Sequence, residues 1–112
     1  MDTRSKIVGE AEARRIAGQA TVVRGYFDPL LAWHAERLTE AKREGTALLV
    51  VIAPPENPIL AARARAELVA GLRVVDYVTE ANIRPQICLD QEDAACFERL
   101  AVRVRGRAAR AS

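Results

Sequence analysis

The sequence is poor in the residues that build most metal, redox and disulfide sites. Its 112 residues include one histidine and two cysteines. The cysteines, Cys88 and Cys96, do not form a CxxC motif, and two are too few for a disulfide scaffold. We therefore expect free thiols that are buried or partly buried. A single histidine without a Cys/His cluster leaves zinc almost no ligands, so the sequence predicts no metal site.

Net charge and long apolar runs are also lacking. Lys and Arg number 17 against 15 Asp and Glu, which leaves a net charge of +2. No chain-wide field therefore attracts nucleic acid or acidic lipid. The N-terminal stretch MDTRSKIVGEAEARRIAG alternates charged and small residues and lacks the apolar run of a signal peptide or membrane span. We expect a cytoplasmic protein without membrane contact.

A local basic feature lies near the C-terminus, where four arginines follow one another closely: Arg103, Arg105, Arg107 and Arg110. Cations are favourable in the last turn of any helix. No aromatic residues interleave with these arginines to stack on bases. Binding of nucleic acid by this segment is therefore the less favoured interpretation.

Strand and helix patterns alternate along the chain. Short β-branched or unbroken apolar runs, typical of buried strands, occupy residues 20–25, 47–53, 74–80 and 86–89. Helical patterns occupy residues 9–18, 32–44, 59–72 and 91–107. This alternation predicts a Rossmann-like α/β fold, a parallel sheet with helices on both faces. No repeat or Gly/Ser linker interrupts it, so we expect one compact domain over residues 1–112, with a helical extension at 1–19 and a flexible tail at 106–112.

Helical spacing also predicts which side chains are buried. In the second helix Leu31, Leu38 and Ala41 fall near one face. In the third helix the predicted buried face consists of Ala61, Leu68, Val69 and Leu72.

The stretch Gly25-Tyr26-Phe27-Asp28 joins the first strand to the second helix. A strand that ends in glycine and turns into a helix directs backbone N–H groups and the positive helix end toward an anion such as phosphate. The same residues also suit an ordinary strand exit, with Asp28 near the start of a helix. The residues that follow the turn decide between these interpretations.

The order of these features over residues 20 to 78 resembles the cytidylyltransferase-like nucleotidyltransferases, a group that includes glycerol-3-phosphate cytidylyltransferase and the nucleotidyltransferase domain of ADP-heptose synthase. Members show GxFDxxHxGH after the first strand, an arginine early in the next long helix, and RxVD after it. This chain reads GYFDPLLAWH, then Arg65, then Arg73-Val-Val-Asp76. The resemblance implies a nucleotidyltransferase-type fold, a homodimer, and CTP or ATP with Mg²⁺ as ligands. It implies catalytic roles for His34 and Arg73 and nucleotide binding by Gly25, Tyr26, Phe27, Asp28, Arg65 and Asp76.

Departures from the family pattern remove much of its chemistry. Leu31 stands where the first histidine of HxGH is expected, and Trp33 stands in place of the glycine. Leucine donates no hydrogen bond, and an indole fills space that the nucleotide needs. The loop PPENPILAA has no lysine, and RVRGRAARAS replaces the Ser/Thr-rich segment of relatives. Loss of one preorganised donor typically lowers the rate by about 10²–10³, so we expect an eroded site with weak or no nucleotidyl transfer.

Alternatives remain for the whole chain and for single residues. The chain could be an active nucleotidyltransferase that joins CTP or ATP to a small phosphorylated alcohol or sugar, with His34 and Arg73 on the phosphates, or a non-catalytic dimerisation or partner-binding module. Trp33 is expected to be a structural anchor rather than a base-stacking residue. Arg65 could clamp phosphate, but we favour a stem packed beside Leu68 and a guanidinium in water. Asp76 could instead hold Arg73 or a backbone N–H.

Overall fold

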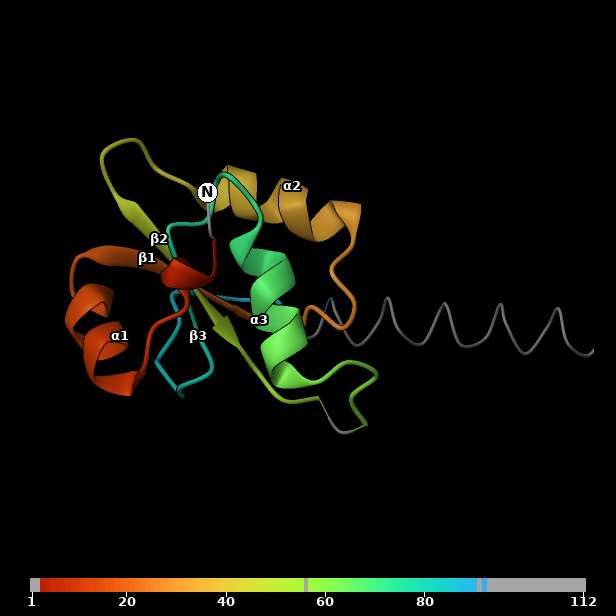
Figure 1. Ribbon diagram of the computed structural model, residues 1–112. Coiled ribbons are helices and arrows are strands. Elements are labelled where there is room, and N and C mark those ends of the chain that lie inside the picture. Colours follow the sequence, from red (N-terminus) through yellow and green to blue (C-terminus); the bar gives the residue numbers. More distant parts are fainter. Residues whose placement is uncertain (1–2, 56, 91, 93–112) are drawn as a thin grey trace, which may run out of the picture.

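Four parallel strands form the centre of the protein. A computed structural model describes residues 3–55, 57–90 and 92 (Figure 1). The strands are β1 (Ala20–Gly25), β2 (Ala47–Ile52), β3 (Tyr77–Thr79) and β4 (Ile87–Cys88). They lie side by side in the order β3-β2-β1-β4, and every pairing is parallel. The predicted parallel α/β sheet is therefore confirmed.

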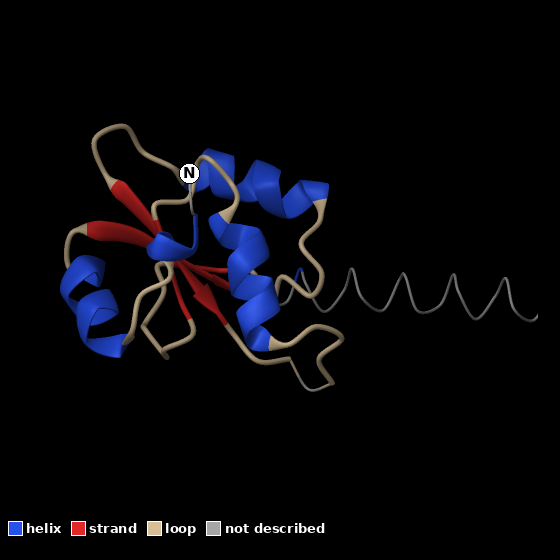
Figure 2. Cartoon of the chain, in the orientation of Figure 1, coloured by secondary structure: helices blue, strands red, loops and turns tan. Residues whose placement is uncertain are grey.

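Helices cover both faces of this sheet (Figure 2). One face packs against α1 (Glu10–Ala17), whose Ala13 and Ile16 join a buried cluster with Val22 and Val51. The other face packs against α2 (Ala32–Ala41) and α3 (Ala62–Ala70). The second cluster includes residues of both helices and of three strands: Leu38, Ala66, Val69, Ala70, Val23, Leu48, Val50 and Val78. Because β2 is covered on both faces, it needs no polar alternation, which explains its unbroken apolar run.

The N-terminal segment covers the outer edge of β3. It begins with a short 3-10 helix, η1 (Thr3–Lys6), and continues into a parallel bridge between Ile7 and Val78. The backbone N–H of Val8 donates to the carbonyl of Val78 at 2.8 Å. The Lys6 ammonium group donates to the carbonyl of Leu72 at 3.0 Å. These contacts fix the segment against the sheet and the end of α3.

Several elements are shorter than their sequence patterns, whereas β1 has the predicted bounds. Helix α2 ends at Ala41 rather than Glu44, because Lys42 adopts an extended conformation, with φ −68° and ψ 124°. The Lys42 ammonium group then donates to the carbonyl of Thr46 at 2.7 Å, inside the α2–β2 loop. Helix α3 covers residues 62–70 of the predicted 59–72, and β3 covers residues 77–79 of the predicted 74–80.

The predicted buried face of α3 is partly wrong. Leu68 is 48% exposed, whereas Arg65 is only 2% exposed. Val69 is buried as expected, but Ala66 and Ala70 fill the remaining positions. The helix is thus turned so that small side chains face the sheet and one arginine lies inside the protein.

Two further expectations have different outcomes. Cys88 is an exposed free thiol, so its predicted burial is wrong; it lies in β4, which pairs only with β1 among the described strands. Outside the described residues lie Cys96, the tail at 106–112 and all of the predicted closing helix at 91–107 except Glu92.

Within the described part of the chain, no helix has the length and apolar character needed to cross a membrane.

Candidate functional site

The carboxyl ends of the strands meet at one edge of the sheet. The turn that joins β1 to α2 and the loop that joins β2 to α3 both leave from this edge. In open parallel sheets, ligands bind at the carboxyl edge where the strand order reverses. In the order β3-β2-β1-β4 that reversal lies between β1 and β4, so this edge is the candidate site.

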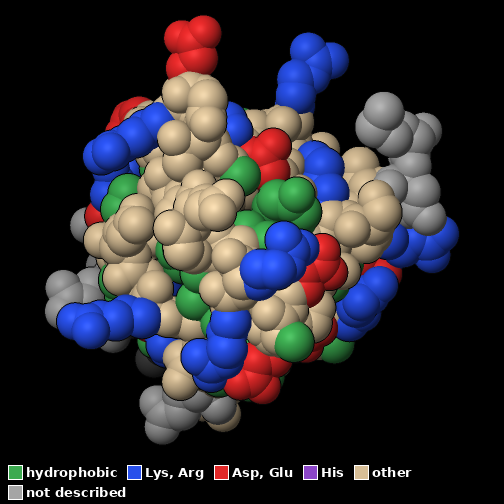
Figure 3. Space-filling view, turned by 90° about the vertical axis from the view of Figure 1, so that its left-hand side faces the viewer, with side chains coloured by type: hydrophobic (Ala, Val, Ile, Leu, Met, Phe, Trp, Pro, Cys, Tyr) green, Lys and Arg blue, Asp and Glu red, His purple; other side chains and the backbone are tan. Residues whose placement is uncertain are grey.

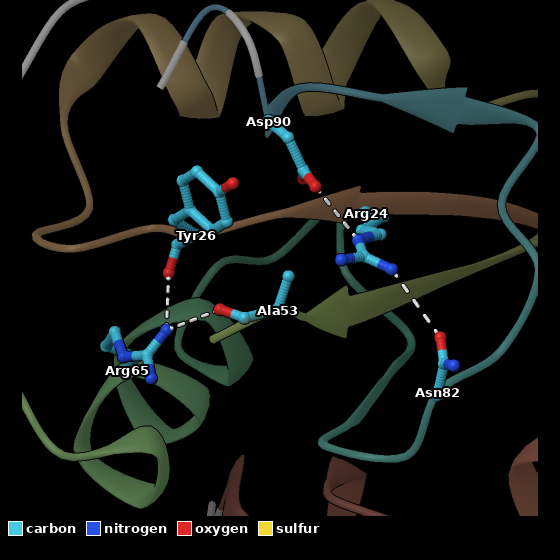
Figure 4. A network of polar contacts seen from close by, with 6 residues as sticks. All are labelled: Arg24, Tyr26, Ala53, Arg65, Asn82 and Asp90. Atoms are coloured by element: carbon cyan, nitrogen blue, oxygen red, sulfur yellow. Dashed lines mark hydrogen bonds and ion pairs between the residues drawn. The ribbon is translucent and has the colours of Figure 1, made fainter. Parts of the chain in front are cut away.

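The turn after β1 is tied to the loop after β2. The carbonyl of Gly25 accepts a hydrogen bond from the Ala53 N–H at 2.9 Å. Phe27 has a left-handed backbone with φ 51°, which is unfavourable for a bulky residue, and its fully buried ring holds it there. Tyr26 is half-buried, and its carbonyl faces Arg65 across the turn (Figure 4).

Asp28 does not cap α2. Its carboxylate accepts hydrogen bonds from the backbone N–H groups of Ile59 at 2.7 Å and Leu60 at 2.8 Å. The N-cap of α2 is Leu31, which has no capping side-chain oxygen. Asp28 therefore connects the turn to the β2–α3 loop, a role that its position near a helix start does not indicate.

Arg65 lies inside the protein, so the prediction of a guanidinium in water beside Leu68 is wrong. Its Nη1 donates to the carbonyl of Ala53 at 2.8 Å and to that of Tyr26 at 3.0 Å (Figure 4). Its Nε donates to the carbonyl of Leu60 at 3.1 Å. Three of its five N–H groups are thus bound to the protein backbone.

His34 is buried, with 1% of its surface exposed. Its Nδ1 accepts a hydrogen bond from the N–H of Leu31 at 2.9 Å, which places the proton of the neutral ring on Nε2. This contact is half of a capping box, in which the third helical side chain caps the residue before the helix. The ring stacks on Trp33, with a centroid distance of 3.9 Å, and lies 5.0 Å from the ring of Phe27.

Trp33 packs against the core cluster beneath α2, as expected for a structural anchor. Its indole Nε1 is buried and finds no hydrogen-bond partner among the residues that the structure describes. The indole therefore occupies the start of α2 and stacks on His34, at the two positions that would be glycine and histidine in the family motif.

A second polar group at this edge involves Arg24, which the sequence analysis missed. Its Nε pairs with Asp90 at 3.0 Å, across the reversal between β1 and β4, and its Nη1 lies 3.5 Å from the side-chain oxygen of Asn82 (Figure 4). Beside it is a hollow of about 300 Å³ lined by Arg24, Val51, Ile52, Ala53, Pro54, Glu80, Ala81 and Asn82. The only sequence signal is one charged residue near the end of an otherwise uncharged strand.

Arg73 and Asp76 lie at the opposite edge of the sheet. The Asp76 carboxylate accepts from the Lys42 ammonium at 2.6 Å and from the Leu48 N–H at 2.8 Å. Leu48 is near the start of β2, four residues before its end at Ile52, which is about 13 Å along a strand. Arg73 is exposed and has no ion pair or hydrogen bond within the described ranges. The structure therefore does not bring this pair to the turn at residues 25–28.

Among the carboxyl groups that the structure describes, Asp76 has a clearly shifted pKa. Burial alone would raise the pKa, but the hydrogen bonds from Lys42 and from the Leu48 N–H, together with the positive charges of Lys42 and Lys6, hold it below its usual value. The contact with a backbone N–H is one of the two roles left open for Asp76. Its environment is that of a structural carboxylate.

Metal ligands do not gather in the described part of the chain. No group of three or more His, Cys, Asp or Glu side chains in it could hold a metal ion.

The face of the molecule shown in Figure 3 carries Lys and Arg interleaved with Asp and Glu rather than a patch of one sign.

Comparison with known proteins gives a partial match. No protein-family model matches the chain. One similar protein is the Bifunctional protein HldE of Chromohalobacter salexigens, which is 33% identical over 84 residues. The match covers 66% of this chain but only 18% of the length of that protein. This similarity and the parallel sheet support a cytidylyltransferase-like, Rossmann-like α/β fold.

Proposed function

We propose that the chain is a cytidylyltransferase-like nucleotidyltransferase-fold protein with an eroded active site and weak or no nucleotidyl transfer. The observation that carries this proposal is the internal use of the groups that the family motif would offer to phosphate. Arg65 is bonded to three carbonyls, and the Nδ1 of His34 is bonded to the N–H of Leu31. Catalysis of phosphoryl transfer depends on donors preorganised around the phosphates.

The start of α2 is also occupied. An anion at a helix N-terminus binds to free backbone N–H groups. Here the N–H of Leu31 already donates to His34, and the ring of Trp33 lies against that histidine. A phosphate at this N–H would have to displace the His34 contact, and the side chain of Leu31 adds no donor of its own.

Mg²⁺ fits this arrangement poorly. Magnesium accompanies nucleotides through one or two carboxylates, usually with several waters. Asp28 is the carboxylate of the turn, and each of its oxygens already accepts a backbone N–H. A metal ion at the turn would therefore have to compete with the backbone of the β2–α3 loop for Asp28.

The similarity to HldE limits the proposal to one fold unit. That protein is named bifunctional, and the match reaches 18% of its length. Only the nucleotidyltransferase-like fold is carried over from HldE to this chain.

We also propose that the chain forms a homodimer and is located in the cytoplasm. Sedimentation at about 20 µM would test the dimer, since a specific pair of subunits should persist at that concentration.

Titration calorimetry with Mg-CTP and Mg-ATP tests the proposal on the wild type and on the double variant Leu31→His/Trp33→Gly. We expect no binding heat from the wild type and measurable binding by the double variant, because it restores a donor and opens space at the turn. Leu31→His/Trp33→Ala separates added space from the flexibility of glycine. Leu68→His, which adds a histidine at an exposed position of α3, is the matched control.

Enzyme activity provides the opposing outcome. Pyrophosphate release from CTP or ATP is measured with glycerol and sugar phosphates as acceptors. Tight nucleotide binding by the wild type, or turnover that His34→Ala abolishes, would show that the active site is functional and would refute the proposal that it is eroded.

A further inference from the structure

The guanidinium of Arg65 joins three separate segments of the carboxyl edge. Tyr26 belongs to the turn after β1, Ala53 directly follows β2, and Leu60 lies just before α3. All three offer backbone carbonyls, at 3.0, 2.8 and 3.1 Å respectively. Figure 4 shows Nη1 between the carbonyls of Tyr26 and Ala53. None of the described carboxylates forms an ion pair with Arg65.

Burial of this cation requires its donors to be satisfied. A buried charge is costly unless hydrogen bonds replace its water. Arg65 is 2% exposed, so the three carbonyls take the place of water. Arginine makes these contacts from two nitrogens of a rigid planar fork, Nη1 for Tyr26 and Ala53 and Nε for Leu60, whereas the donors of lysine all start from one atom and cannot reproduce this geometry.

Asp28 holds the same loop from the other side. Its carboxylate accepts the N–H groups of Ile59 and Leu60, and the carbonyl of Leu60 accepts from Arg65. Leu60 is thus fixed by an anion at its N–H and by a cation at its carbonyl. The two charges act on the backbone between them, so the turn and the loop are connected through Leu60.

We propose that Arg65 is a positioning residue that sets the turn at residues 25–28 against the backbone of Ala53 and Leu60, which flank the β2–α3 connection. It does this through three carbonyls and not through contact with a ligand. Any ligand that binds at the turn therefore depends on Arg65 indirectly. This last step rests on the proposed function, whereas the positioning itself does not.

Amide hydrogen exchange measured by NMR tests the positioning without any ligand. The reporters are the N–H groups of Ile59 and Leu60, which are bonded to Asp28. The reference is the N–H of Asp76, which donates to the carbonyl of Leu48 at the far edge. In Arg65→Lys we expect the protection of both reporters to fall at least about tenfold relative to the reference, because local opening and global unfolding are separate processes.

Chemical rescue provides a second readout. Arg65→Ala leaves three carbonyls around an empty guanidinium position. Guanidinium chloride at about 50 mM, where its denaturing effect is small, should restore reporter protection at least about threefold, and sodium chloride at the same concentration should not. The matched control is Arg63→Lys, an exposed arginine of the same helix that pairs with Glu67 at 3.3 Å. It should change neither reporter.

The outcomes separate the positioning role from simpler ones. Unchanged reporter protection in Arg65→Lys, or equal loss at the reporters and at Asp76, would overturn the proposal. Should Arg65→Ala not fold, the lysine variant decides alone. A separate experiment, nucleotide titration of Leu31→His/Trp33→Gly with and without Arg65→Lys, tests whether ligand binding at the turn depends on Arg65. If that double variant binds no nucleotide, the proposed function fails, but the exchange result still decides the positioning role.

Discussion

Asp76 offers a test of the electrostatics at the amino edge of the sheet, through the substitution Asp76→Asn. The carboxylate receives the Lys42 ammonium at 2.6 Å and the Leu48 N–H at 2.8 Å. The side chains of Lys42 and Asp76 are 31% and 39% exposed, so solvent screens the ion pair. Such a pair contributes about 0.2–1 kcal/mol. The weaker hydrogen bond from Leu48 to a neutral acceptor adds about 0.5 kcal/mol, so we expect the variant to be about 1 kcal/mol less stable at pH 7.

The pH dependence follows from the lowered pKa of Asp76 in the folded protein. A group with a lowered folded-state pKa stabilises the protein fully above its unfolded value, about 3.9 for aspartate. This stabilisation is lost as the pH falls through the folded-state pKa, where the wild-type carboxylate also becomes neutral. The difference in unfolding free energy between wild type and Asp76→Asn should therefore be largest near pH 7 and shrink below about pH 4.

Urea unfolding between about pH 7 and pH 3 measures this difference. Glu44→Gln is the matched control, since Glu44 is an exposed carboxylate in the neighbouring α2–β2 loop. The control should change stability by less than about 0.5 kcal/mol at each pH. A difference for Asp76→Asn that stays constant, or that grows as the pH falls, would refute the assignment of the stabilisation to the ionised carboxylate.

Four further substitutions test three local features by urea unfolding at pH 7. Gly45 has a left-handed backbone, with φ +80°, and no atom lies near an added Cβ. Gly45→Ala should therefore cost about 1 kcal/mol through backbone strain alone. A smaller loss would mean that the loop adjusts. Leu68 is exposed and Val69 is buried. Leu68→Gln should therefore change stability by less than about 0.5 kcal/mol, whereas Val69→Ala should cost about 2 kcal/mol. Equal effects would contradict the orientation of α3. His34→Phe should cost about 1–3 kcal/mol, because the N–H of Leu31 loses its acceptor, and no loss would mean that another group replaces it.

The strands and the start of α2 could be predicted from the sequence because local patterns determine them. Residues 20–25 form β1 with the predicted bounds, and α2 begins at Ala32 as expected. Unbroken β-branched runs can be buried on both faces only within a covered sheet. The ends of elements depended on tertiary contacts instead. Lys42 leaves the helical conformation, and its ammonium group binds the carbonyl of Thr46 in the loop and the carboxylate of Asp76, which is 34 residues away and cannot be found from helical spacing.

The turn after β1 was predicted by position, but its contacts were not. The sequence placed Gly25, Phe27 and Asp28 in a turn, and the structure confirms that turn. The sequence alone could not show that Asp28 and Arg65 bind the backbone of a distant loop, because a hydrophobicity pattern treats any arginine as an outward residue. Arg24 was missed for the same reason, since its partners Asn82 and Asp90 are far away in the sequence.

The bridge between Ile7 and Val78 gives the sheet two unlike margins. On the β3 side, the carbonyl of Val78, in the middle of the strand, is occupied by the N–H of Val8. Among the residues that the structure describes, no strand pairs with the outer side of β4. Within those residues, the protein's own chain therefore blocks strand addition beside β3 and leaves the margin that contains Cys88 without such a block.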